Sequence, residues 1–151
     1  MAAVRIVDTS VFCNILAVPG RCQDQDIALA ELREFIDQDD TLLLPMAAVY
    51  ETGNHIAQAA TGRHRTAERF KKQVQDALDG ESPFEPTRIH DADEVRTWLS
   101  DFPDHAAQGI GIGDRSIISV WEAMRERTPS RRVVIWAYES HLSGHDRKPQ
   151  I

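Results

Sequence analysis

Four acidic residues, far apart in the sequence, are candidates to bind a metal ion together: Asp8, Glu51, Asp114 and Glu139. Four clustered carboxylates cannot all be ionised unless a cation lies between them. Ligation by oxygen alone favours a hard ion, Mg²⁺ or Mn²⁺. Such ions make hydroxide from water and stabilise the leaving oxygen when a phosphodiester bond is cleaved. The four acids therefore predict a metal-dependent nuclease, provided that the fold brings them together.

Three short runs rich in β-branched and apolar residues predict strands that could position these acids. The runs are Val4–Val7, Thr41–Leu44 and Val133–Trp136. They alternate with helical patterns, which indicates an α/β fold with a central, mostly parallel sheet flanked by helices. Ligands bind such sheets beyond the carboxyl ends of the strands. Asp8 directly follows the first run, Glu139 lies three residues after the last, and Asp114 stands at a helix start on the same edge. We therefore expect these three acids to meet in space.

Glu51 reaches the same edge from a helix. Pro45 suits the first turn of a helix that runs through Ile56, and Glu51 lies less than two turns from its start. The residues around Glu51, AAVYETG, are largely apolar, and burying an isolated carboxylate is very costly. Glu51 therefore needs a partner, which a shared metal ion would supply.

Periodic apolar residues predict the other helices, and glycine and proline mark their ends. The expected helices begin near Thr9, Asp24, Pro45, Thr66, Asp91 and Asp114. We expect Pro103 to close the fifth helix, and Ser82–Thr87 to be a connection because it contains proline. The glycine-rich segment Gly109–Gly113 should be a flexible turn that gives Asp114 room to approach its metal ion.

Each acid taken alone also has an ordinary explanation. Asp8 and Asp114 could each cap a helix, because Asp is a favoured N-cap residue. Glu51 could pair with an arginine or with His55 one turn on, and Glu139 could be a solvated loop acid. The hypothesis of a shared metal site rests on their order and placement together.

Size and composition limit the class of protein. The chain has 151 residues, the size of one domain, and such a domain buries roughly 70% of the surface that its unfolded chain exposes. No apolar run approaches the roughly 20 residues needed to cross a bilayer, and the two cysteines match no zinc spacing. We therefore expect one nuclease domain over residues 1–151 that is cytoplasmic, with reduced thiols and no membrane partner.

The net charge of −7 argues mildly against a protein that coats nucleic acids, but the charge is unevenly distributed. One segment, from 63 to 72, carries five basic residues: Arg63, Arg65, Arg69, Lys71 and Lys72. These residues could bind RNA phosphates, which their position beside the Glu51 helix favours. The alternative is a charged helix face turned to solvent.

Four stretches of the sequence, in this order and spacing, resemble a PIN-domain protein, and particularly the ribonuclease toxins of VapC-type toxin–antitoxin modules. They are VRIVDTSVF, PMAAVYETGN, GIGDRSIIS and VVIWAYESHLSGHD, and together they span nearly the whole chain. The resemblance implies a PIN-like three-layer fold and places the acidic quartet of the family on Asp8, Glu51, Asp114 and Glu139. The family usually has Asp where this chain has Glu139. Ser10 matches a small hydroxyl residue that can orient a ligand or water beside the first Asp.

The same resemblance implies Mg²⁺-dependent endoribonuclease activity, homodimerisation and inhibition by a small antitoxin protein. A phosphatase of the haloacid dehalogenase type also begins with a strand ending in Asp, but its chemistry needs a second Asp where this chain has Ser10. We set that function aside. A catalytically silent PIN-like module that binds RNA or a partner protein stays open, and Glu139 in place of Asp favours it.

Overall fold

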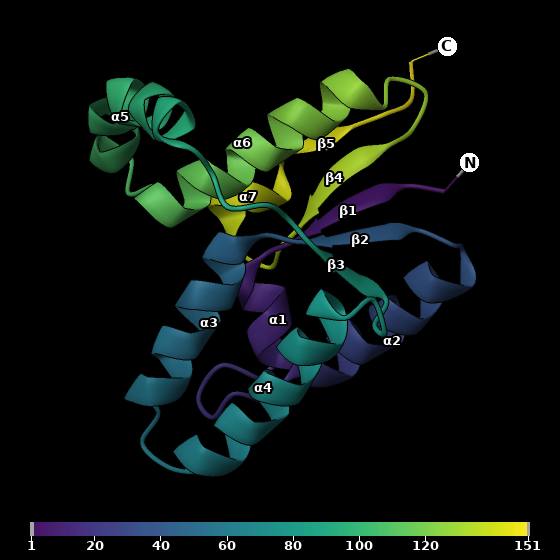
Figure 1. Cartoon of the computed structure of the whole chain (residues 1–151), viewed down its shortest axis with the longest axis vertical. Coiled ribbons are helices and arrows are strands. Elements are labelled where there is room, and N and C mark those ends of the chain that lie inside the picture. Colours follow the sequence, from purple (N-terminus) through teal and green to yellow (C-terminus); the bar gives the residue numbers. More distant parts are fainter. Residues whose placement is uncertain (1, 151) are drawn as a thin grey trace.

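The computed structural model describes residues 2–150, and within them a five-stranded sheet forms the centre of the molecule (Figure 1). In chain order the strands are β1 (Val4–Val7), β2 (Thr41–Leu44), β3 (Phe84–Pro86), β4 (Val133–Trp136) and β5 (Asp146–Arg147). Their order across the sheet is β3-β2-β1-β4-β5. All neighbouring pairs are parallel except β4 and β5. The predicted α/β fold with a mostly parallel sheet is confirmed.

Helices cover both faces of the sheet. Within residues 2–150 they are α1 (Thr9–Ile15), α2 (Gln25–Asp37), α3 (Met46–Gln58), α4 (Arg63–Leu78), α5 (Ala92–Ala107), α6 (Ile112–Arg127) and α7 (Ser140–Ser143). Figure 1 shows α1 to α4 on one side of the sheet and α5 to α7 on the other, which makes three layers. None of the helices in this part of the chain is long and apolar enough to span a membrane.

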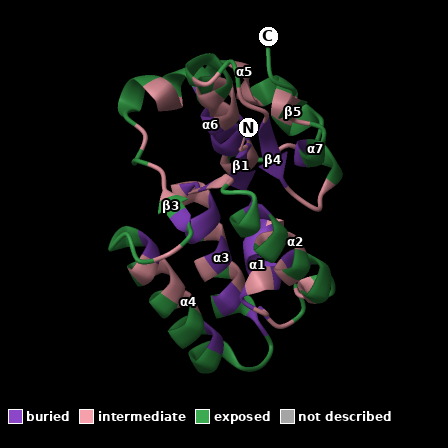
Figure 2. Ribbon diagram, turned by 90° about the vertical axis from the view of Figure 1, so that its right-hand side faces the viewer, coloured by how far each residue is buried: buried purple, intermediate pink, exposed green. Residues whose placement is uncertain are grey.

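The core has two halves because side chains alternate along each strand. In β1, Val7 belongs to the same core as Phe12 and Phe35 on the α1–α4 side, whereas Ile6 packs with Ile117 of α6. Every residue of β1 is buried, as expected for a central strand covered on both faces. Figure 2 shows the buried residues in the strands and on the inward faces of the helices. This division fixes the register, because a slip of one residue would exchange the two faces.

The prediction that Ser82–Thr87 is only a connection is wrong, because Phe84–Pro86 forms strand β3. The segment pairs with β2 at the edge of the sheet, where the missing N–H of Pro86 is tolerated. The next residue, Thr87, donates its N–H to β2 at 3.0 Å. Phe84 is buried and contacts Phe12 edge to face, with ring centroids 5.7 Å apart. Packing and pairing therefore make this proline-containing segment a strand.

α5 continues through Pro103, so the prediction that this residue ends the helix is wrong. Proline removes one backbone hydrogen bond from a helix interior. Two tertiary contacts near Pro103 stabilise the helix and offset the missing hydrogen bond. Trp98 is buried, and the carboxylate of Asp101 accepts hydrogen bonds of 3.0 to 3.2 Å from Arg115 of α6. Tertiary contacts thus override the local preference.

Two other helices begin earlier than predicted. α4 begins at Arg63 rather than Thr66, after Gly62 adopts the left-handed conformation with φ +67°. α6 begins at Ile112, so the glycine-rich turn is shorter than predicted and Asp114 is the third residue of its helix. The first turn of α6 consequently carries Asp114 toward the carboxyl edge of the sheet.

Candidate active site

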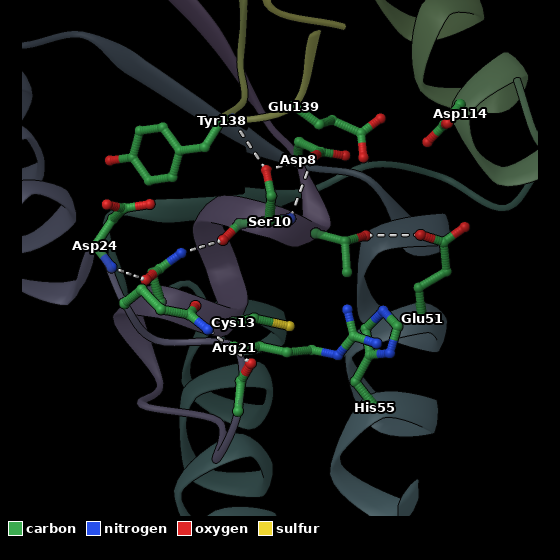
Figure 3. A pocket seen from close by; sticks show the side chains of 14 residues that line it. Asp8, Ser10, Cys13, Arg21, Asp24, Glu51, His55, Asp114, Tyr138 and Glu139 are labelled. Atoms are coloured by element: carbon green, nitrogen blue, oxygen red, sulfur yellow. Dashed lines mark hydrogen bonds between the residues drawn. The ribbon is translucent and has the colours of Figure 1, made fainter. Parts of the chain in front are cut away.

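A cavity of about 390 Å³ opens at the carboxyl ends of β1 and β4, and the four predicted acids all line it (Figure 3). Its walls come from α1, the loop after α1, α3, α6 and the segment that follows β4. The residues are Asp8, Thr9, Ser10, Cys13, Asn14, Gly20, Arg21, Gln23, Asp24, Glu51, His55, Asp114, Tyr138 and Glu139. The fold therefore brings together acids that are far apart in the sequence.

Asp8 both caps α1 and faces the cavity. Its carboxylate accepts a hydrogen bond from the backbone N–H of Ser10 at 3.1 Å and another from the Ser10 hydroxyl at 2.6 Å. Asp8 is only 2% exposed, and this burial raises its pKa although the bonds from Ser10 oppose the rise. The Ser10 hydroxyl also accepts the N–H of Tyr138 at 3.0 Å. Ser10 thus links Asp8 to the segment that carries Glu139, and it occupies the orienting position expected from the sequence.

Glu51 points from α3 into the cavity, and among residues 2–150 it pairs with neither an arginine nor His55. Its Oε2 accepts a hydrogen bond of 2.9 Å from the hydroxyl of Thr9. Its Oε1 lies against Gly113 of α6, where an added Cβ would be only 1.7 Å away. Burial raises the pKa of Glu51, and the neighbouring acids raise it further. This carboxylate is therefore held between two helices without a cationic partner.

Asp114 and Glu139 both line the cavity and influence each other's protonation. Their carboxyl groups face one another in the cavity, and each affects the pKa of the other (Figure 3). Burial, followed by the charges of Asp114 and Asp8, raises the pKa of Glu139 to about 7. Within the described chain, Oε1 of Glu139 is buried and has no hydrogen-bond partner. Glu139 is thus an inward-facing carboxyl group and not a solvated loop acid.

The cavity has the donor atoms for a hard cation but no tight ligand set. No group of three or more His, Cys, Asp and Glu side chains among residues 2–150 is arranged to hold a metal ion. Two observations nevertheless fit a cation among the four acids. Oε1 of Glu139 lacks a partner, and all four carboxyl groups have raised pKa values, as expected when acids are buried together without a counter-ion. Carboxylate oxygens suit Mg²⁺ or Mn²⁺.

Sequence reasoning missed several residues of the cavity. The Thr9 hydroxyl donates a hydrogen bond to Glu51. Its position directly after Asp8 in the sequence could have indicated a place in the site. Arg21 comes from the loop after α1, where no spacing or periodicity pointed to it. Tyr138 donates its hydroxyl to Glu31 of α2, a contact that only the folded chain reveals.

The predicted RNA-binding residues of α4 lie outside the cavity lining. Arg69 donates to the carbonyl of Leu16 at 3.0 and 3.1 Å and to that of Ala17 at 3.3 Å, so it anchors the end of α1. These bonds give Arg69 a structural role, and its predicted contact with RNA phosphate stays a prediction. The other four basic residues are on exposed positions of α4: Arg63, Arg65, Lys71 and Lys72.

No protein-family model matches the sequence, and no curated protein and no solved structure is significantly similar to it. What the cavity does must therefore be inferred from its own residues and from the motifs in the sequence.

Proposed function

We propose that the protein is a metal-dependent endoribonuclease, which cleaves RNA with Mg²⁺ or Mn²⁺ bound among Asp8, Glu51, Asp114 and Glu139. The observation that carries the proposal is the convergence of these acids on one cavity. Burying four like charges destabilises a fold, and strongly perturbed carboxyl groups cluster at functional sites. The resemblance to PIN-domain ribonucleases leads to the same residues and adds RNA as the substrate.

A cation at this site would lower the pKa of a bound water molecule and stabilise the charge on the leaving oxygen. The chain itself orients the acids. Ser10 fixes Asp8 through two hydrogen bonds, and Thr9 fixes one oxygen of Glu51. Because Thr9 and Ser10 form the first turn of α1, one short segment positions acids from two different elements.

Glu139 is the acid whose protonation changes near neutral pH. Its pKa of about 7 means that the cation-free protein holds a proton there for much of the time. A positive charge nearby favours the ionised form of a carboxyl group. Glu139 would therefore release its proton as a cation binds, and its unpaired Oε1 would gain a partner.

The biological role that we propose is the toxin of a toxin–antitoxin module. In this role the protein acts in the cytoplasm as a homodimer, and a small antitoxin protein inhibits it. This part of the proposal rests on the resemblance of the four sequence stretches to VapC-type toxins. Growth arrest on expression of the chain, relieved by co-expression of a small protein encoded beside it, would support the role.

RNA cleavage by the purified chain tests the proposed activity. Single-stranded RNA should be cut internally when Mg²⁺ is present, and EDTA should stop the reaction until excess Mg²⁺ is added back. Glu51→Gln, prepared in parallel, is the control for contaminating ribonucleases, because it removes a proposed ligand and keeps the volume of the side chain. Cleavage that survives EDTA, or that is equal in Glu51→Gln, would reject the proposal.

One observation favours a second function, a catalytically silent PIN-like module that binds RNA or a partner protein. The acids in residues 2–150 form no tight ligand set, and the last of them is the longer Glu139 with a pKa of about 7. Both features weaken a metal site at neutral pH. Binding of RNA without cleavage at any Mg²⁺ or Mn²⁺ concentration would support this function over the nuclease.

A further inference from the structure

The loop between α1 and α2, residues 17–24, borders the cavity in a defined shape. Val18 is fully buried, and its N–H donates to the carbonyl of Cys13 at 3.0 Å. The N–H of Arg21 donates to the carbonyl of Val18 at 2.9 Å, which closes a turn around Pro19 and Gly20. The loop therefore presents Arg21 from a fixed position.

Side chains from two helices hold the ends of this loop. At its start, Arg69 of α4 donates two hydrogen bonds to the carbonyl of Leu16. At its end, the side chain of Asn14 accepts the N–H of Asp24 at 2.8 Å. Asn14 is buried and also donates to the carbonyl of Ser10 at 2.7 Å. One set of hydrogen bonds thus connects the loop to the segment that orients the acids.

Arg21 extends into the cavity without a partner (Figure 3). Its guanidinium lies toward the imidazole of His55, and its charge adds to burial in lowering the pKa of that histidine. It forms no hydrogen bond or ion pair through its side chain within residues 2–150. Of the described residues that line the cavity, Arg21 is the one lysine or arginine. An unpaired guanidinium in an acidic cavity is therefore available to a ligand.

We propose that Arg21 binds a backbone phosphate of the substrate next to the scissile phosphate, and so positions the RNA across the four acids. This inference rests on the proposed nuclease function. The planar fork of N–H donors on arginine matches phosphate oxygens in a bidentate manner. The acids repel a phosphate that is not bound to a cation. A second phosphate in the cavity therefore needs a positively charged side chain as its partner.

The positions of the charged groups in the cavity fit a phosphate contact at Arg21. In Figure 3 the carboxyl groups of Asp8, Asp114 and Glu139 lie together, and Glu51 lies between them and the pair formed by Arg21 and His55. Asp24 is a further acid of the lining. Burial and the charge of Arg21 lower the pKa of His55, which disfavours a second positive charge beside Arg21. Arg21 is thus the fixed positive charge of this pair.

Binding of a short single-stranded RNA across a salt series tests the inference, with Asp8→Asn as the common background to prevent cleavage. Adding Arg21→Gln should weaken binding about tenfold, the expected loss of one charge-assisted contact. It should also reduce the log–log salt slope by about 0.7, the value for one phosphate on a single strand. Arg21→Lys should restore the slope but only part of the affinity, because it keeps the charge and loses the fork. Arg33→Gln removes an equal charge from an exposed position of α2 outside the lining, and should change neither.

Steady-state cleavage by the otherwise wild-type chain gives the second readout. Arg21→Gln should raise KM about tenfold and lower kcat by less than about threefold, because the bound phosphate does not react. A loss that falls mainly on kcat would place Arg21 at the reacting phosphate and overturn the inference, as would an unchanged salt slope. If the wild-type chain cleaves no RNA, the proposed function fails separately. The salt slope still decides the phosphate contact in that case.

Discussion

Glu51 of α3 occupies the space that a side chain at Gly113 of α6 would need. A Cβ at Gly113 would lie 1.7 Å from Oε1 of Glu51 and 2.8 Å from its Cδ. Gly113 is helical, so close approach rather than unusual backbone conformation requires glycine here. The first turn of α6 therefore lies directly against one proposed metal ligand and carries another, Asp114.

Gly113→Ala should separate the stability of the fold from the function of the site. Alanine is the better helix former by about 0.8–1 kcal/mol, and the carboxylate of Glu51 is the end of a flexible side chain that can move aside. We expect the free energy of unfolding in urea to stay equal or rise by up to about 1 kcal/mol. Mn²⁺ affinity and RNA cleavage should fall at least about tenfold, because Glu51 is displaced. Gly111→Ala is the matched control, since a Cβ there meets no atom within 4 Å. Full cleavage by Gly113→Ala would exclude Glu51 from the site.

Glu139 can be tested by changing its charge and its length separately. Glu139→Gln should weaken Mn²⁺ binding at least about tenfold in calorimetric titration, because a ligand charge is lost. Glu139→Asp should keep substantial RNA cleavage, because it restores the acid that the resembling family usually has. Unchanged Mn²⁺ affinity in Glu139→Gln would place this residue outside the metal ligands.

The cation-free protein should lose stability as pH rises through neutrality. Glu139 has a pKa of about 7 in the fold, raised from 4.5, so the folded state holds its proton more tightly than the unfolded state. Its stabilising contribution is therefore fully present below about pH 4.5 and is lost as pH rises through about 7. His55, whose pKa is lowered, acts in the opposite direction over part of this range. Melting temperatures in EDTA from pH 5 to 8.5 should thus decline more steeply in wild type than in Glu139→Gln. Parallel curves for the two proteins would contradict the assignment.

A buried ion pair at the other end of the sheet should matter for stability alone. Arg5 of β1 donates to Asp40 at 2.6 Å, and the two side chains are 9% and 2% exposed. Asp40→Asn leaves the buried guanidinium without its counter-charge, which costs about 3–5 kcal/mol. Urea unfolding measures this loss, with Asp39→Asn at an exposed neighbouring position as the control, expected within about 0.5 kcal/mol of wild type. Asp40→Asn should leave Mn²⁺ affinity per folded molecule unchanged.

The sequence predicts the centre of the fold because apolar runs and acids carry local signals. The strands β1, β2 and β4 follow from their short runs rich in β-branched and apolar residues, and Asp8 and Glu139 follow from their places just beyond two of these strands. The common edge of parallel strands then brings these acids together. Helix boundaries near Gly62 and Ile112 differ by a few residues, because glycine tolerates both helix starts and turns.

The features that sequence reasoning missed depend on contacts between distant segments. Pro86 argues against a strand in the sequence, but pairing with β2 makes its segment an edge strand. Pro103 stays helical because Arg115 of α6 donates a hydrogen bond to Asp101 of α5. Arg69 looks like part of a basic run, yet its guanidinium reaches carbonyl groups at the end of α1. Arg21 has no pattern of its own, and only the shape of its loop directs it into the cavity.

RNA cleavage by Asp8→Asn, measured beside a thermal melt, tests the metal-site account most directly. Asp8 is the most buried of the four acids and follows the central strand, so its loss should disable the site while Asn keeps its volume. We predict that Mg²⁺-dependent cleavage falls about a hundredfold or more. The melting temperature in EDTA should stay equal or rise, because one repelling carboxylate is gone. Wild-type cleavage rates in a folded Asp8→Asn protein would contradict the claim that these acids form a catalytic metal site.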